Sequence, residues 1–221
     1  KSPYGIRLIQ GSHIIVPKLY EGEKAFIMQN DDRRIVFAIP YLNDFTMIGT
    51  TDHEYQGDPA QVKITQQEID YLIAVSNAHF NKQLVQADIV STFAGVRPLC
   101  DDESDNPSAV TRDYTLALSK GEGEQAPLLS VFGGKLTTYR KLAESAMQQL
   151  KTFFPEMQGS WTATQALPGG ENMESVEQLM QEIRAQVTDA SEALAKRWGS
   201  AYGSRVWNIL GEITSVQQLG Q

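Results

Sequence analysis

Short apolar runs with alternating polar positions occupy the first quarter of the chain and predict β-strands. The predicted strands cover Ile6–Gln10, His13–Val16, Ala25–Gln29, Arg33–Ile39 and Phe45–Thr50. Glycines, prolines and an Asn-Asp-Asp cluster separate these runs, and no helical pattern lies between them. Strands with such short connections pair in antiparallel fashion, so the pattern predicts an antiparallel sheet.

A helical pattern follows these strands. Between Thr65 and Phe80, apolar residues recur every three or four positions, as on one face of a helix. Thr65 and Glu68 have the spacing of a capping box, which marks a helix start. We therefore expect an α+β fold in which this helix covers one face of the antiparallel sheet.

Strand patterns return in the middle of the chain, at Ile89–Val96, Thr111–Leu118 and Pro127–Phe132. The last of these runs through Gly133-Gly134 into a helical pattern that extends from Leu136 to Leu150. A strand, a glycine turn and a helix in this order can face a phosphate or a cofactor.

The composition changes after Pro155. Residues 159–170 have a loop-like composition, and a boundary is predicted near Pro168-Gly169-Gly170. Helical patterns then run from Ser175 to about Arg197 and from Gly203 to Leu210. The chain is thus expected to end in a helical segment.

Composition and charge exclude several classes of protein. The chain has 19 Lys+Arg against 27 Asp+Glu, a net charge of −8, and no basic stripe, which argues against nucleic-acid binding. No apolar run approaches the roughly 20 residues of a membrane helix. The single cysteine, Cys100, has no intrachain partner, so a cytosolic location is expected. The chain begins at Lys1 and stops soon after a helical pattern, from which we expect a fragment of a longer protein.

Three apparent motifs fail on inspection. Gly121–Ala126 matches a dinucleotide fingerprint but precedes a strand instead of a helix, so it predicts a hairpin turn. Gly133-Gly134-Lys135 lacks the hydroxyl residue of a P-loop, because Leu136 follows. The acidic run Asp101–Asn106 lacks the carboxylate that closes a calcium loop. No metal site is expected, because His13, His53 and His79 are dispersed in sequence.

Two groups of residues have chemistry of their own. Arg97 closes an apolar strand and is followed by Pro98; it can bind a phosphate or carboxylate, or it can pair with the acidic loop that follows. Gly133 and Gly134 allow a close approach to the backbone, and Lys135 adds a positive charge beside a helix N-terminus. His13 places an ionisable ring on the sheet, whereas His79 suits a helix C-terminus and His53 a turn. The positive charge and the helix N-terminus at Gly133-Gly134-Lys135 favour an anionic ligand.

Five segments in the same order and spacing resemble the bacterial aerobic, FAD-dependent glycerol-3-phosphate dehydrogenases, members of the D-amino-acid-oxidase-like flavoproteins. They are Gly11-Ser12-His13-Ile14-Ile15-Val16-Pro17, Ile48-Gly49-Thr50-Thr51-Asp52, Gly95-Val96-Arg97-Pro98-Leu99, Thr111-Arg112-Asp113-Tyr114 and Phe132-Gly133-Gly134-Lys135-Leu136-Thr137-Thr138-Tyr139-Arg140. The resemblance covers essentially the whole chain. The family's N-terminal strand-GxGxxG-helix is absent from this sequence, which again suggests a fragment.

The resemblance implies an enzyme that oxidises sn-glycerol 3-phosphate to dihydroxyacetone phosphate by hydride transfer to FAD and passes the electrons to quinone. It implies a cytoplasmic location and peripheral contact with the inner face of the membrane, and it is compatible with a homo-oligomer. Residues 1–110 would form the substrate-binding sheet domain, 111–168 the last strand and helix of the FAD-binding domain, and 169–221 the start of a helical domain. The fragment alone would be inactive.

The resemblance also assigns roles to residues. His13 would be the catalytic base and Arg97 a catalytic and substrate-binding residue, with Arg112 and Lys135 as further substrate contacts. The flavin-facing loop would consist of Gly133, Gly134, Lys135, Leu136 and Thr137. Two alternatives stay open: a glycerol-3-phosphate oxidase that uses O2, and a non-catalytic interaction module in which these residues are structural.

Overall fold

The computed structural model describes residues 5–100, 113–121, 123 and 125–220. The chain divides into two compact units, residues 1–155 and 156–221. Each unit has an apolar core of its own.

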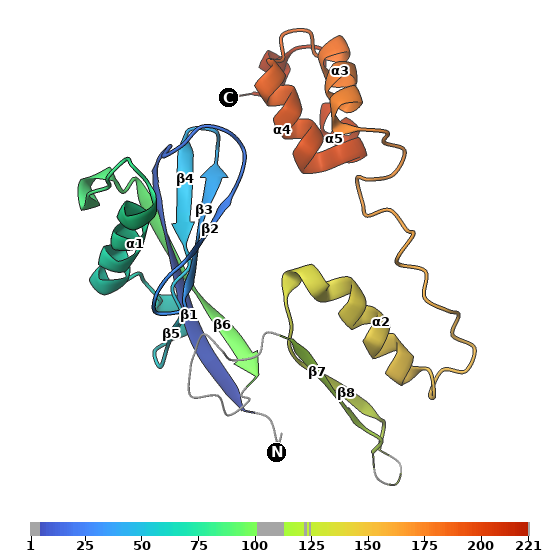
Figure 1. Ribbon diagram of the computed structural model, residues 1–221. Helices are drawn as coiled ribbons and strands as arrows, with labels where there is room; N and C mark the ends of the chain where they lie inside the picture. Colours follow the sequence, from blue (N-terminus) through green and yellow to red (C-terminus); the bar gives the residue numbers. More distant parts are fainter. Residues whose placement is uncertain (1–4, 101–112, 122, 124, 221) are drawn as a thin grey trace. The chain divides into compact units, whose positions relative to one another are not determined.

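The first unit is built on an antiparallel sheet (Figure 1). Its strands are β1 (Ile6–Pro17), β2 (Phe26–Gln29), β3 (Ile35–Tyr41), β4 (Phe45–Gly49), β5 (His53–Glu54) and β6 (Ser91–Cys100). They lie in the order β2-β3-β4-β1-β5 along one path, and β6 pairs with the other edge of β1. The predicted antiparallel sheet is confirmed.

The prediction of two separate strands on either side of Gly11 is wrong, because β1 is one continuous strand of 12 residues. Gly11 lies opposite Gly95 of β6, inside an unbroken ladder that joins Ile6 to Cys100 and Ile15 to Ser91. A Cβ atom at Gly11 would overlap the guanidinium group of Arg97. Gly11 therefore marks a close approach of a side chain to the strand and not an end of the strand.

Helix α1 (Gln66–His79) covers one face of this sheet, as predicted (Figure 1). Thr65 caps it, and both hydrogen bonds of the predicted capping box to Glu68 are present. The interface consists of Ile14, Val16, Met28, Val36, Ala38, Ile48, Leu72, Val75 and Leu84, all buried. His79 is the last residue of α1, where its Nδ1 lies 2.9 Å from the carbonyl of Val75, in agreement with its predicted place at the helix C-terminus.

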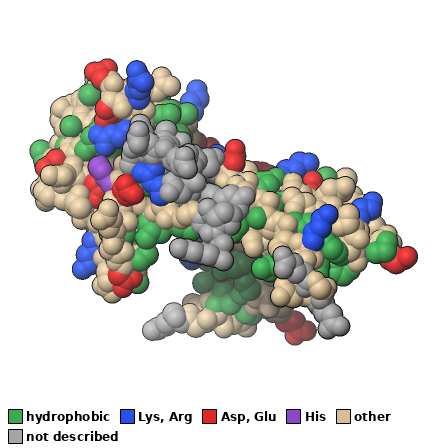
Figure 2. All heavy atoms as spheres, turned by 90° about the horizontal axis from the view of Figure 1, so that it is seen from below, with side chains coloured by type: hydrophobic (Ala, Val, Ile, Leu, Met, Phe, Trp, Pro, Cys, Tyr) green, Lys and Arg blue, Asp and Glu red, His purple; other side chains and the backbone are tan. Residues whose placement is uncertain are grey.

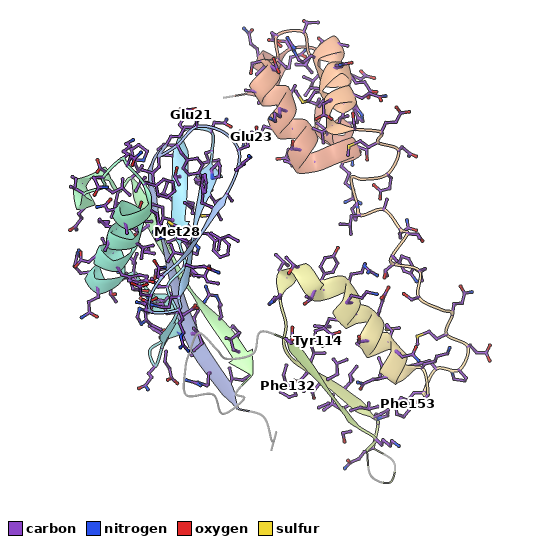
Figure 3. All side chains as sticks on the ribbon, viewed as in Figure 1. Glu21, Glu23, Met28, Tyr114, Phe132 and Phe153 are labelled. Carbon is purple, nitrogen blue, oxygen red and sulfur yellow. The ribbon has the colours of Figure 1, made fainter. Side chains whose placement is uncertain are left out.

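A hairpin and a helix complete the first unit. Strands β7 (Tyr114–Ser119) and β8 (Leu128–Gly133) pair in antiparallel fashion, so the expected hairpin around residues 121–126 is confirmed. Helix α2 (Tyr139–Leu150) follows. The hydroxyl of Tyr114, on β7 (Figure 3), forms a hydrogen bond of 3.0 Å with Oγ of Ser145, on α2. The predicted start of this helix at Leu136 is wrong: Leu136 to Thr138 form a 3-10 turn, and the Leu136 side chain is 89% exposed.

The second unit is helical, with α3 (Val176–Gln186), α4 (Glu192–Tyr202) and α5 (Val206–Leu210). The helical pattern predicted from Ser175 to about Arg197 forms two helices, α3 and α4, because Ser191 caps the start of the second one. Its core contains Leu179, Ile183, Val187, Ala190, Ala195, Val206 and Leu210, flanked by Trp198 and Trp207. Among all the described residues, no helix is long and apolar enough to span a bilayer.

Short 3-10 turns lie at Pro59–Gln61, Gln86–Asp88, Leu136–Thr138, Gly203–Arg205 and Val216–Leu219. Beyond α2, the segment 156–175 consists of turns and extended chain that leads into α3. The compact division falls after Pro155, earlier in the chain than the boundary predicted near Pro168-Gly169-Gly170. The assignment of 1–110, 111–168 and 169–221 to functional domains stays a prediction.

Candidate functional site

The face of the sheet opposite α1 carries a row of residues that crosses five strands. Pairing aligns Ile27 of β2, Phe37 of β3, Gly49 of β4, His13 of β1 and Phe93 of β6. Side chains at paired positions point to the same face of a sheet, so this row is apolar apart from His13. In this row, the titratable ring of His13 lies between Phe93 on one side and Gly49 on the other, with Phe37 beyond Gly49.

His13 is held in this row by its neighbours. Its ring stacks on Phe93, with centroids 4.7 Å apart and an interplanar angle of 7°. Burial, and then the positive charge of Arg97, lower the pKa of His13 below its usual value of 6.5. The imidazole is therefore neutral at pH 7 and available as a proton acceptor. Its buried Nδ1 has no hydrogen-bond partner among the described residues.

Gly49 provides the space for the His13 ring. A Cβ atom at this position would overlap Cδ2 and Cγ of His13, whereas a Cβ atom at Gly95 would meet nothing within 4 Å. We predict that Gly49→Ala lowers the free energy of unfolding by about 1–3 kcal/mol, as overpacking does. Gly95→Ala, on strand β6 at the other edge of β1, is the matched control and should cost clearly less. Urea denaturation of both variants measures the difference; equal losses would mean that Gly49 does not accommodate His13.

Arg97 lies on the same face as His13. It pairs with Ile9 in the β1–β6 ladder, and its guanidinium group extends over Gly11, two residues before His13 on β1. Residues i and i+2 of a strand lie on the same face, about 7 Å apart. The guanidinium of Arg97, over Gly11, and the imidazole of His13 are therefore neighbours. The sheet thus brings together a cation and a neutral imidazole.

Two residues that follow β4 hold the guanidinium of Arg97. Nη1 forms an ion pair with the Asp52 carboxylate, and Nη2 donates to the Thr50 hydroxyl at 2.9 Å. The Arg97 side chain remains 31% exposed, so part of its donor fork is open to a ligand. Asp52 and Thr50 have no assigned role in the sequence-based prediction, although a Thr-Thr-Asp run directly after a strand is a signal for polar chemistry at a sheet end.

The acidic loop expected as an alternative partner of Arg97 lies outside the described residues, as does the predicted substrate contact Arg112. The observed partner is Asp52, 45 residues earlier in the chain. Neither prediction about residues 101–112 is tested.

Arg97 and the glycine loop line one cavity of about 760 Å³. Its walls include Val96 to Leu99 of β6 and the segment from Val131 to Leu136, which contains Gly133, Gly134 and Lys135. Four of the five predicted loop residues therefore face the same cavity as Arg97. His13 and Thr137 are not among the residues that line it.

The loop is suited to a flat, partly anionic group. Gly133 and Gly134 have φ angles of 69° and 100°, which favour glycine and leave the backbone bare. Leu136 and Thr137 begin a helical turn, so their N–H groups have no partner within that turn. The Lys135 side chain adds a positive charge. Donors and a positive charge in this arrangement can stabilise the edge of a flavin that becomes negative on reduction. The assignment of these residues to a flavin-facing loop stays a prediction.

The sequence predicts no metal site and argues against nucleic-acid binding. Among the described residues, no group of three or more His, Cys, Asp or Glu side chains could hold a metal ion. On the face shown in Figure 2, the Lys and Arg side chains lie scattered among acidic and apolar ones.

His53 does not lie in the turn expected from the sequence, because it is an exposed residue of the short strand β5 and pairs with Gln10 of β1.

Comparison with known proteins shows the family of this chain. Residues 2–140 match the profile described as FAD dependent oxidoreductase. Over the whole chain, the sequence is 65% identical to a glycerol-3-phosphate dehydrogenase from Pseudomonas aeruginosa. It is 51% identical to the aerobic glycerol-3-phosphate dehydrogenase of Escherichia coli and 43% identical to a D-erythritol 1-phosphate dehydrogenase of Brucella abortus.

A solved structure shares the fold. The glycerol-3-phosphate dehydrogenase from Bacillus halodurans, complexed with FAD, superposes with a TM-score of 0.75 at 28% identity. The match covers 96% of this chain and 40% of that one. Likewise, the chain spans 43% of the Pseudomonas aeruginosa relative and 44% of the Escherichia coli relative. The resemblance inferred from the sequence is confirmed, and the chain belongs to the FAD-dependent oxidoreductase family.

Proposed function

We propose that the chain forms the substrate-binding side of a flavoenzyme that oxidises sn-glycerol 3-phosphate to dihydroxyacetone phosphate. The observation that carries the proposal is the placement of His13 and Arg97 on one face of the sheet, with Arg97 also lining a cavity beside the Gly133-Gly134 loop. The names of the relatives supply the substrate class. A neutral base beside a cation matches the needs of an alcohol that loses a proton while its phosphate is held.

Each residue has a defined part in this reaction. His13 accepts the proton of the C2 hydroxyl, because its lowered pKa keeps the imidazole neutral. Arg97, with Lys135 as a second cation, binds the phosphate or the oxygen that becomes a carbonyl. Bound FAD would supply a hydride acceptor for C2, so that the alcohol loses one proton to His13 and one hydride in total. The Gly133–Thr137 loop would hold the flavin ring of FAD, and its backbone N–H groups and the Lys135 charge would stabilise the edge of that ring that becomes negative on reduction.

The rest of the proposal concerns the longer protein. Residues 1–110 contribute the substrate-binding sheet, 111–168 the last strand and helix of the FAD domain, and 169–221 the start of a helical domain. The electron acceptor is quinone, and the enzyme lies in the cytoplasm with peripheral contact to the inner face of the membrane. A homo-oligomer is compatible with this arrangement. The chain alone is inactive, because the relatives it matches are more than twice as long.

Anaerobic flavin reduction tests the proposal. The full-length protein with FAD is mixed with glycerol 3-phosphate or with glycerol, and the bleaching of the flavin absorbance is followed. We expect rapid bleaching with glycerol 3-phosphate and a rate lower by about 10²-fold or more with glycerol, because the charge-assisted contacts to the phosphate are lost. No bleaching with either compound would favour the non-catalytic module.

Reoxidation of the bleached flavin separates the dehydrogenase from the oxidase. A short-chain quinone is expected to restore the absorbance within the turnover time, whereas air alone should restore it slowly. Fast reoxidation by O2 with stoichiometric hydrogen peroxide would instead identify an oxidase.

A further inference from the structure

A buried carboxylate lies behind the site, on the side of the sheet that packs against α1. Glu68 is the third residue of α1 and only 1% exposed. Its Oε2 accepts hydrogen bonds from the backbone N–H of Thr65 at 2.8 Å and from the side chain of Gln10 at 2.9 Å. Its Oε1 accepts a hydrogen bond of 2.5 Å from the hydroxyl of Thr51.

These contacts exceed what a helix cap requires. The capping box needs only Glu68 and Thr65, and a glutamate in that role is usually exposed to solvent. The bonds from Gln10 of β1 and from Thr51 tie the carboxylate to the sheet. Burial raises the pKa of Glu68, but the hydrogen bonds from Thr51 and Thr65 outweigh it, so the group is charged.

Thr51 connects this carboxylate to Arg97. Thr51 is fully buried, and its hydroxyl oxygen also accepts a hydrogen bond from the backbone N–H of Ser12 at 3.0 Å. Its two neighbours in sequence, Thr50 and Asp52, are the residues that hold the guanidinium of Arg97. The Thr50 hydroxyl donates to the Thr51 carbonyl at 3.0 Å, which turns its oxygen lone pairs toward Nη2 of Arg97.

We propose that Glu68 is a positioning residue for Arg97, acting through Thr51. The buried charge fixes the hydroxyl of Thr51, and Thr51 fixes the backbone from which Thr50 and Asp52 reach the guanidinium. Arg97 thereby meets an anionic substrate group in one orientation without reorganisation. This inference rests on the proposed function, since it presumes that Arg97 binds the substrate.

The test uses the full-length protein with FAD and compares Thr51→Val with Thr51→Ser. Valine has a similar shape but no hydroxyl, whereas serine restores the hydrogen bond to Glu68. We expect Thr51→Val to raise KM for glycerol 3-phosphate about tenfold, within the roughly hundredfold effect of a misplacement of about 1 Å, and Thr51→Ser to return KM close to the wild-type value. Glu68→Gln, which keeps the shape of the side chain, should also raise KM.

Thr65→Ala is the matched control, because it removes a hydrogen bond from the same carboxylate on the α1 side only. It should lower Tm about as much as Thr51→Val while KM stays within twofold of the wild type. An equal rise of KM in both variants would mean that KM follows general stability, and the inference would be wrong.

A double-mutant cycle with Arg97→Ala separates this inference from the proposed function. If Thr51 acts through Arg97, Thr51→Val should not raise KM further in the Arg97→Ala background. A further tenfold rise there would overturn the positioning role. If Arg97→Ala alone leaves both kcat and KM unchanged, Arg97 is not part of the site and this inference is wrong, whereas the proposed function is decided separately by the bleaching of the flavin.

Discussion

Replacement of Arg97 by alanine is expected to lower kcat/KM for glycerol 3-phosphate by about 10²- to 10⁴-fold in the full-length, FAD-loaded protein. Arg97 is the cation that is fixed on the sheet by Asp52 and Thr50 and also faces the cavity beside the glycine loop. Hydrogen bonds to a charged group contribute about 1.5–3 kcal/mol each, and a guanidinium can form two of them to one phosphate. Steady-state kinetics in a dye-reduction assay measures the loss.

Arg97→Lys is the control for this prediction. Lysine keeps the positive charge but has no planar donor fork, so it should recover only part of the lost kcat/KM. The rate with glycerol identifies the group that Arg97 binds: an unchanged rate indicates the phosphate, and a parallel loss indicates the reacting oxygen. Wild-type kinetics with glycerol 3-phosphate in Arg97→Ala would remove Arg97 from the site.

Replacement of His13 by glutamine is expected to lower kcat by about 10²- to 10⁴-fold, the usual contribution of a general base. The wild-type pH profile supplies a second readout. The pKa of His13 is lowered from 6.5, so the imidazole is neutral when the pH is above this lowered pKa. It becomes protonated, and cannot act as a base, when the pH falls below this pKa. The kcat/KM of the wild type should therefore decline about tenfold per pH unit once the pH falls below the lowered pKa of His13, and the decline should begin at a more acidic pH than an ordinary histidine would give.

The His13→Gln variant should lack this acid limb, because no imidazole is left to protonate. His79→Ala is the control, since His79 lies at the end of α1 on a different element. It should keep both the wild-type kcat and the acid limb. If the limb persists in His13→Gln, another group is the base.

Local patterns in the sequence were sufficient for the elements that local interactions determine. The capping box at Thr65 and Glu68 predicts the start of α1 correctly, because both hydrogen bonds lie within four residues. The turn residues around Gly121 likewise predict the β7–β8 hairpin. These features depend on neighbours in sequence, which a single chain displays directly.

Features that depend on distant residues were missed. Gly11 resembles a strand break, but the structure shows that the Arg97 side chain covers it. The pairing of Arg97 with Asp52 spans 45 residues, and no local pattern identifies Asp52 as the partner. The predicted helix start at Leu136 failed for a different, local reason, since the chain first makes a 3-10 turn after the glycines. His13 and Arg97 were singled out by residue type and resemblance, and their placement on one face came only from the register of β1 and β6.

The central claim is that this face of the sheet binds the substrate through Arg97 and His13. A crystal structure of the full-length protein with FAD and a non-oxidisable glycerol 3-phosphate analogue tests it most directly. The account predicts an oxygen of the analogue about 2.7–2.9 Å from the Arg97 guanidinium and a His13 ring nitrogen within about 3.2 Å of the C2 substituent. An analogue bound on the flavin but away from both side chains would contradict it.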